Sequence, residues 1–217
     1  MDTTYEISTQ FFREDGEDNT LNFEVTCRVA DTGNRCAYLR GFLHEPGYMP
    51  NEMMDEGYFD VFDSRSSHAV DGLEILCQQQ DQIMRALGSD FETDHFFGIA
   101  FLERAWIVSK LRGTGLTHRL MREAQHVLSR PDLLVMLKAH PDEADADENG
   151  ISTTSKHTSA DDCRKLARYY RFDKTLDLRE LDRVNFPGWM VALWSDRVQT
   201  RDDRYWHCSR RWPPTGY

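Results

Sequence analysis

Residues 107–117 read Ile107-Val108-Ser109-Lys110-Leu111-Arg112-Gly113-Thr114-Gly115-Leu116-Thr117, an apolar run that passes into a glycine-rich turn and then into a helix. A strand that leads into small residues at a helix start leaves several backbone N–H groups unpaired beside the positive end of the helix dipole. The stretch therefore predicts a site for a diphosphate group. An ordinary strand-to-helix turn is the alternative interpretation of the same residues.

Two better-known phosphate loops do not match this stretch, because it has neither the Gly-Lys-Ser/Thr of a P-loop nor the three spaced glycines of a dinucleotide-binding fold. It carries an Arg-Gly-x-Gly-x-small pattern with Ile107 five positions before Arg112. This pattern resembles the acetyl-CoA-binding motif of the GNAT superfamily of N-acetyltransferases, with Arg112, Gly113 and Gly115 matching. Thr117 stands where the family usually has Gly or Ala, and its hydroxyl is able to cap the helix or contact a phosphate oxygen.

The resemblance implies a single α/β (α+β) domain whose mixed central sheet of six to seven strands is flanked by helices and has splayed central strands. It implies acetyl-CoA as the co-substrate, a primary amine as the acceptor, and no metal. Backbone N–H groups from Ile107 to Ser109 would bind the thioester carbonyl and the pantetheine amides. The cofactor-binding residues would be Ile107, Val108, Ser109, Arg112, Gly113, Thr114, Gly115, Leu116 and Thr117.

Glu103 is the first choice for the general base that accepts the proton of the amine. It lies four residues before Ile107, so strand alternation predicts that both side chains share one face. An ion pair with Arg104 is the alternative. His95, His118 and His140 are further candidates because histidine titrates near neutral pH. His118 is expected near the cofactor phosphates, and His95 at the far end of the strand.

A second local match to the family suggests which residue is the general acid, the group that gives a proton to the leaving thiolate. The segment Arg164-Lys165-Leu166-Ala167-Arg168-Tyr169-Tyr170 resembles a later helix of the family, in which a tyrosine lies near the sulfur. Tyr170 would then protonate the leaving thiolate; its alternative is a core aromatic. Arg171-Phe172-Asp173-Lys174 stands where the family usually has Gly-Phe, so a different turn is expected there.

The 217 residues, 40% of them hydrophobic, are enough for one sizeable core, which predicts one domain over residues 1–217. With 26 basic and 37 acidic residues the formal charge is −11, which disfavours nucleic acid and anionic membrane surfaces as partners. The charge mildly favours a cationic small-molecule or peptide amine acceptor. The alternative is that the negative charge serves only to keep the protein soluble. A homodimer is left open.

Five cysteines without zinc-type spacing indicate reduced thiols in a cytosolic protein. A bridge between Cys27 and Cys36 across a hairpin is the less favoured alternative. The segment Met1–Glu6 has no signal-peptide character, and no run approaches the roughly 18 apolar residues of a membrane span. A cytoplasmic location is expected.

Hydrophobic periodicity predicts the remaining elements. Three segments lack a readable apolar period: a polar N-terminal segment 1–20, an acidic solvated or mobile loop 140–158, and a tail 197–217 that would pack either on the body of the protein or on a partner. Within the acidic loop, Asp145–Gly150 is similar to the start of a calcium loop, but Lys156 replaces the required glutamate. Strands are expected at 21–29, 37–44, 58–62, 96–108, 133–137 and 189–194, and helices from Ser66 to Leu87, from Leu116 to Leu128 and from Ser159 to Tyr170.

Two functions of other classes remain alternatives to the enzyme. One is a GNAT-like module that binds an acyl-CoA without transferring the acyl group. The other is an interaction protein that docks a partner through its tryptophan-rich tail.

Overall fold

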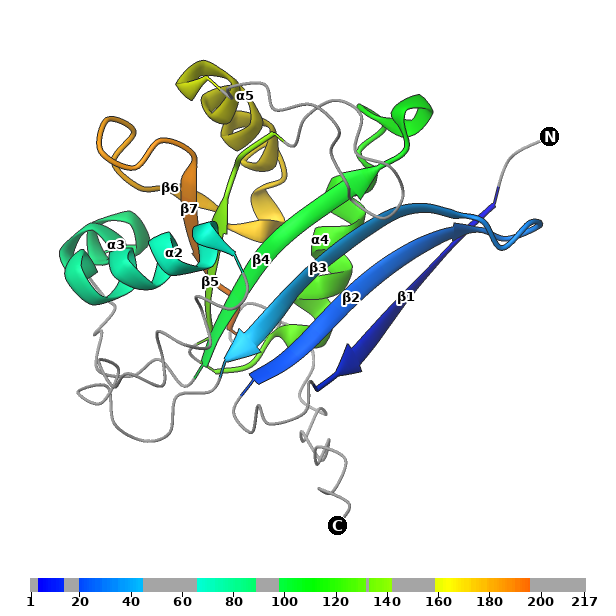
Figure 1. Ribbon diagram of the computed structural model, residues 1–217, viewed down its shortest axis with the longest axis horizontal. Helices are drawn as coiled ribbons and strands as arrows, with labels where there is room; N and C mark the ends of the chain where they lie inside the picture. The colour runs from blue at the N-terminus through cyan, green and yellow to red at the C-terminus, as the bar shows by residue number, and fades with distance from the viewer. Residues whose placement is uncertain are drawn as a thin grey trace, which may run out of the picture.

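The computed structural model describes residues 4–13, 20–44, 66–88, 98–131, 133–141 and 159–195. Their strands form one seven-stranded open sheet in the order β1-β2-β3-β4-β5-β7-β6 (Figure 1). β4 and β5 are parallel, and every other neighbouring pair is antiparallel. The predicted mixed sheet is therefore confirmed. The strands are β1 (Tyr5–Phe12), β2 (Thr20–Val29), β3 (Arg35–His44), β4 (Gly98–Ile107), β5 (Leu133–Lys138), β6 (Arg179–Glu180) and β7 (Trp189–Leu193).

Helices cover both faces of the sheet, as expected. α4 (Leu116–Leu128) and α5 (Ala160–Tyr170) contribute to one hydrophobic cluster with β2, β3, β4 and β5. α2 (Ser67–Gln78) and α3 (Gln80–Leu87) form a second cluster on the opposite face, over β4, β5 and β7. Figure 1 shows α2 and α3 in front of the sheet and α4 behind it. Two short 3-10 turns, η3 (Ser109–Leu111) and η4 (Lys174–Leu176), complete the described elements.

β1 corrects the prediction that the first twenty residues form only a polar segment. It pairs along its whole length with β2 as an edge strand. Tyr5, Ile7 and Thr9 are half-buried, and the residues between them are exposed. One face of an edge strand remains in water, so its polar residues do not exclude a strand.

The predicted helix after Ser66 is two helices. The Ser66 hydroxyl accepts a hydrogen bond from the Ala69 N–H (3.1 Å) and caps α2. Gln79 leaves helical geometry, with φ −126° and ψ 34°, and separates α2 from α3. The chain leaves α3 at Gly88, as predicted, with a φ of +101°.

The other described elements agree with the predicted ones to within a few residues, except for β6 and the two 3-10 turns, which were not predicted. The predicted strand 58–62, most of the acidic loop and the tail 197–217 lie outside the described residues. In the part of the chain that the structure describes, no helix is both long and apolar enough to cross a bilayer.

Cys27 and Cys36 are free thiols that face each other at the end of the β2–β3 hairpin, with 3.6 Å between their sulfur atoms. Cys36 is the extra residue of a bulge, because Cys27 pairs with Ala37 and Arg28 with Arg35. Burial, together with the hydrogen bond from Cys36, raises the pKa of the Cys27 thiol to about 12. Cys27 therefore stays protonated at neutral pH and is a poor nucleophile.

Candidate active site

Glu103 is the extra residue of a second bulge, between β3 and β4. Arg40 pairs with Arg104 and Gly41 with Leu102, so Glu103 has no register partner on β3. A Cβ atom on Gly41 would lie 2.1 Å from the carbonyl oxygen of Phe101, so only glycine fits at this point of β3. A bulge bends its strand and increases the local twist.

β4 and β5 part directly beyond this bulge. Their parallel pairing runs from Gly98 opposite Leu133 to Leu102 opposite Leu137 and stops there, while β4 continues to Ile107. Figure 1 shows the two strands close together at one end and diverging toward the other. The pairing stops at Leu137, one residue before β5 itself ends, and a splay of the two strands at 107–109 stays a prediction.

The backbone of the second half of β4 alternates in direction. Val108 donates its N–H to the carbonyl of Cys36 at 3.0 Å, so this N–H points toward β3. In an antiparallel pair the backbone groups of successive residues point to opposite sides. The N–H groups of Ala105 and Ile107 therefore point toward the side from which β5 has diverged. The N–H of Val108 is therefore already used within the sheet, in contrast to the role predicted for it, whereas the N–H of Ala105, which was not predicted, points to the same side as that of Ile107.

The glycine loop, residues 112–115, follows η3 and leads into α4. Gly113 and Gly115 have φ values of +79° and +80°, and a Cβ atom on either would meet no other atom within 4 Å. Gly115 is the N-cap of α4 and has no side chain with which to accept from the first N–H groups of the helix. Those groups, from Leu116 to His118, have no carbonyl one turn earlier to pair with. The loop therefore offers open space beside helix N–H donors, which fits a diphosphate group.

Two side chains of the loop form hydrogen bonds to backbone carbonyls just before it. Arg112 donates its Nε–H to the carbonyl of Ile107 (3.2 Å), and the Thr114 hydroxyl donates to the carbonyl of Leu111 (2.7 Å). Thr117 is buried, with 8% of its surface exposed. Ser109 is exposed in η3, and its carbonyl accepts the N–H of Arg112 (3.2 Å).

Glu103 and Tyr170, the two predicted catalytic residues, line one cavity of about 50 Å³. The cavity lies where β4 and β5 part, because its walls include Leu102 to Ala105 of β4 together with the end of β5. Tyr170 is 8% exposed and belongs to the hydrophobic cluster under α4, which agrees with its alternative as a core aromatic, while its role as the acid stays a prediction. The remaining lining residues are Leu39, His68, Met121, Leu137, Lys138 and His140.

The alternation argument that places Glu103 on the face of Ile107 does not apply to this strand, and the role of Glu103 as general base stays a prediction. Alternation from Ile107 back to Glu103 requires a regular strand, and the bulge at Glu103 interrupts it. Ala105 and Ile107 pack against the cluster under α4, whereas Trp106 stacks on Tyr38 on the other face.

A group of polar residues beside the cavity was missed from the sequence, apart from His140. The Lys138 ammonium lies 3.2 Å from Oδ2 of Asp71 and 3.3 Å from Nδ1 of His68. The rings of His68 and His140 are 5.0 Å apart. An ammonium only donates, so Nδ1 of His68 accepts from Lys138. The available signal was position, since Lys138 ends β5, the buried strand that is parallel to β4, and His140 lies just beyond its end.

His118 lies in the first turn of α4, and its side chain is buried against the end of α5, so its expected place near cofactor phosphates stays a prediction. It is 5% exposed, donates from Nε2 to the carbonyl of Tyr169 (2.9 Å) and stacks on the Tyr169 ring at 4.4 Å between centroids. It therefore connects α4 to the end of α5 and holds Tyr170 near the cavity. His95 lies outside the described residues.

Comparisons of this chain with protein-family models, with curated proteins and with solved structures find no match. Its function is therefore argued from the chemistry of the site.

Proposed function

We propose that this chain is a GNAT-type N-acetyltransferase that moves the acetyl group of acetyl-CoA to a primary amine. One observation supports this most strongly. β4 parts from β5 beside a glycine loop at the start of a helix, and the cavity at that point is lined by a carboxylate, Glu103, and a phenol, Tyr170.

The backbone supplies the groups that would hold the co-substrate. N–H groups at the start of α4 face the open space at Gly113 and Gly115, where a diphosphate would gain from both hydrogen bonds and the helix dipole. The N–H groups of Ala105 and Ile107 are donors for the pantetheine amides and for the thioester carbonyl. Donors fixed in a strand cost little reorganisation as negative charge develops on that carbonyl oxygen.

Two side chains would handle the protons. As the amine nitrogen bonds to the acetyl carbon, Glu103 takes a proton from the nitrogen directly or through a water molecule. The carbon–sulfur bond then breaks, and the Tyr170 hydroxyl gives its proton to the departing thiolate. Lys138 beside the cavity places a positive charge near the reacting groups.

A second candidate is an acyl-CoA-binding protein that does not transfer the acyl group. It is favoured by the small size of the cavity that Glu103 and Tyr170 line. Its volume of about 50 Å³ is well below the roughly 300 Å³ at which pockets for small molecules, such as an amine acceptor, begin.

Calorimetric titration with acetyl-CoA tests the shared part of both candidates. We expect binding on the order of micromolar, abolished by Gly115→Trp, which fills the open space at the start of α4. Gly33→Trp is the matched control. Gly33 also has a positive φ (+67°) and open space around it, but it lies in the β2–β3 turn. Absence of binding by folded wild-type protein, or equal loss in both variants, overturns the assignment.

Release of free thiol from acetyl-CoA in the presence of a panel of amines separates the two candidates. The enzyme predicts release that depends on one class of amine. Tight binding without release for any amine, in a panel spanning small amines, amino acids and peptides, favours the binding protein.

A further inference from the structure

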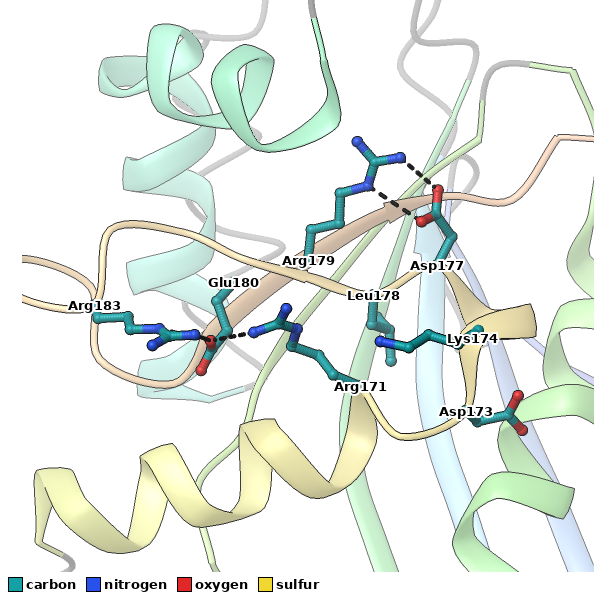
Figure 2. Close-up of a pocket in the computed structure, with 8 residues that line it drawn as sticks. All are labelled: Arg171, Asp173, Lys174, Asp177, Leu178, Arg179, Glu180 and Arg183. Carbon is teal, nitrogen blue, oxygen red and sulfur yellow. Dashed lines mark hydrogen bonds and ion pairs between the residues drawn. The ribbon is translucent and has the colours of Figure 1, made fainter.

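A second and larger cavity lies at the edge of the sheet formed by β6. Its volume is about 460 Å³, within the roughly 300–1,000 Å³ range of small-molecule sites. None of its lining residues lines the cavity of Glu103 and Tyr170. Figure 2 shows its charged side chains, which are four basic residues and three acidic ones, with Leu178 among them. They are Arg171, Lys174, Arg179, Arg183, Asp173, Asp177 and Glu180.

Arg179 has a structural role in this cavity. Its Nε and Nη2 donate to the two carboxylate oxygens of Asp177, at 3.2 and 3.0 Å. Its Nη1 donates to the carbonyls of Ala86 and Leu87, at 3.1 and 2.7 Å, and so ties β6 to the end of α3. Every nitrogen of this guanidinium is therefore engaged, and Asp177 is neutralised by it.

Two arginines share one carboxylate. Nη1 of Arg171 lies 3.0 Å from Oε2 of Glu180, and Nη2 of Arg183 lies 2.6 Å from the same oxygen. Glu180 is largely buried, with 8% of its side chain exposed, whereas the side chains of Arg171 and Arg183 are 40% and 60% exposed. One carboxylate balances one of the two positive charges. The pair also retains N–H donors that Glu180 does not occupy.

Lys174 adds a further positive charge. Its ammonium has no hydrogen bond or ion pair with any described residue. The nearby carboxylate of Asp173 is already taken, by Nε of Arg122 at 2.9 Å and by the hydroxyl of Thr175 at 2.7 Å. In Figure 2 the side chain of Lys174 extends toward Leu178, at the centre of the group, while that of Arg171 extends toward Glu180.

From this balance we propose that the cavity binds a small molecule through a carboxylate or phosphate group, held by Lys174 and the unused donors of Arg171 and Arg183. Two positive charges without a carboxylate of their own are concentrated here in a chain whose net charge is −11. Charged hydrogen bonds to oxyanions are the strong ones, and guanidinium groups match oxyanion geometry. Only Leu178 offers an apolar contact, so the ligand is expected to be polar throughout.

Amide NMR with two probes, inorganic phosphate and succinate, tests the proposal, with sodium chloride at the same ionic strength as the reference. We expect saturable shifts at Lys174 and Leu178 for at least one probe. Lys174→Gln is expected to weaken that binding at least fivefold. Saturation by phosphate alone assigns a phosphorylated ligand, and saturation by succinate alone assigns a carboxylate.

Lys165→Gln is the matched control, because it removes the same charge from α5 at a side chain that is 75% exposed and paired with Asp162. It is expected to bind the probes like wild type. Shifts that chloride reproduces, equal weakening in both variants, or shifts confined to Gly113 and Gly115 overturn the proposal. The last outcome would assign the oxyanion to the glycine loop instead.

Discussion

Glu103 combines an unusual backbone position with a chemically suitable side chain. As the extra residue of a bulge, it is held at the point where β4 and β5 part, in the same cavity as Tyr170. Bulges often occur beside active sites because they redirect a side chain. The same position also suits a purely structural ion pair, so the two roles need a kinetic test.

Glu103→Gln is expected to lower kcat/KM for acetyl transfer by about 10²–10⁴-fold, the usual contribution of a general base. The amide keeps the shape of the side chain but cannot accept a proton, so the acidic limb of the pH–rate profile should also disappear. Glu74→Gln, at an exposed position of α2, is the control. Unchanged kinetics with an unchanged pH profile would leave Glu103 a structural role only.

Asp173 makes stability depend on pH. Burial opposes its ionisation, but hydrogen bonds from Thr175 and the charges of Arg122 and His118 outweigh it and lower the pKa of Asp173 below the usual value. A lowered pKa contributes stability that is present above the unfolded value, near 3.9, and is lost as the pH falls through the folded value.

Asp173→Asn should therefore reduce the free energy of unfolding by about 1 kcal/mol at pH 7. The difference from wild type should shrink as the pH falls below about 4. Urea unfolding at pH 7 and pH 3 measures it, with Asp31→Asn in the exposed β2–β3 turn as the control. A difference that stays constant between these pH values contradicts the linkage.

At the scale of elements, the bulge between β3 and β4 depends on Gly41. A Cβ there would lie 2.1 Å from the Phe101 carbonyl oxygen and 2.9 Å from Cζ of Phe23. We expect Gly41→Ala to cost about 3 kcal/mol by overpacking and to weaken acetyl-CoA binding. Gly33→Ala, which suffers only an unfavourable φ, should cost about 1 kcal/mol. Equal costs in denaturant unfolding would show that the close approach relaxes without effect.

Elements with strong periodicity were predictable from the sequence, and weakly marked ones were not. The buried strand β5 and the amphipathic helix α4 carry clear apolar patterns. β1 was missed because its exposed face is polar, and the break at Gln79 carries neither glycine nor proline to mark it. Local sequence does not reveal a bulge either, because a bulge is defined by pairing with another strand.

At the scale of the whole molecule, the glycine loop and the meeting of Glu103 with Tyr170 were predictable, because the loop is local and the family resemblance linked the two side chains. The group around Lys138 was not predictable, since Lys138 contacts Asp71 and His68, which lie 67 and 70 positions before it in the sequence. The hydrogen bond from the Val108 N–H to the Cys36 carbonyl likewise depends on how β3 and β4 pair. The charged cavity needs segments on both sides of η4 to fold together.

Amide NMR during titration with acetyl-CoA tests most directly the claim that the chain binds this co-substrate where β4 leaves β5. The account predicts saturable shifts at Ala105, Ile107, Gly113 and Gly115, with Gly33 unaffected. Saturable shifts that leave these four amides unchanged, or no shifts at all, would contradict it.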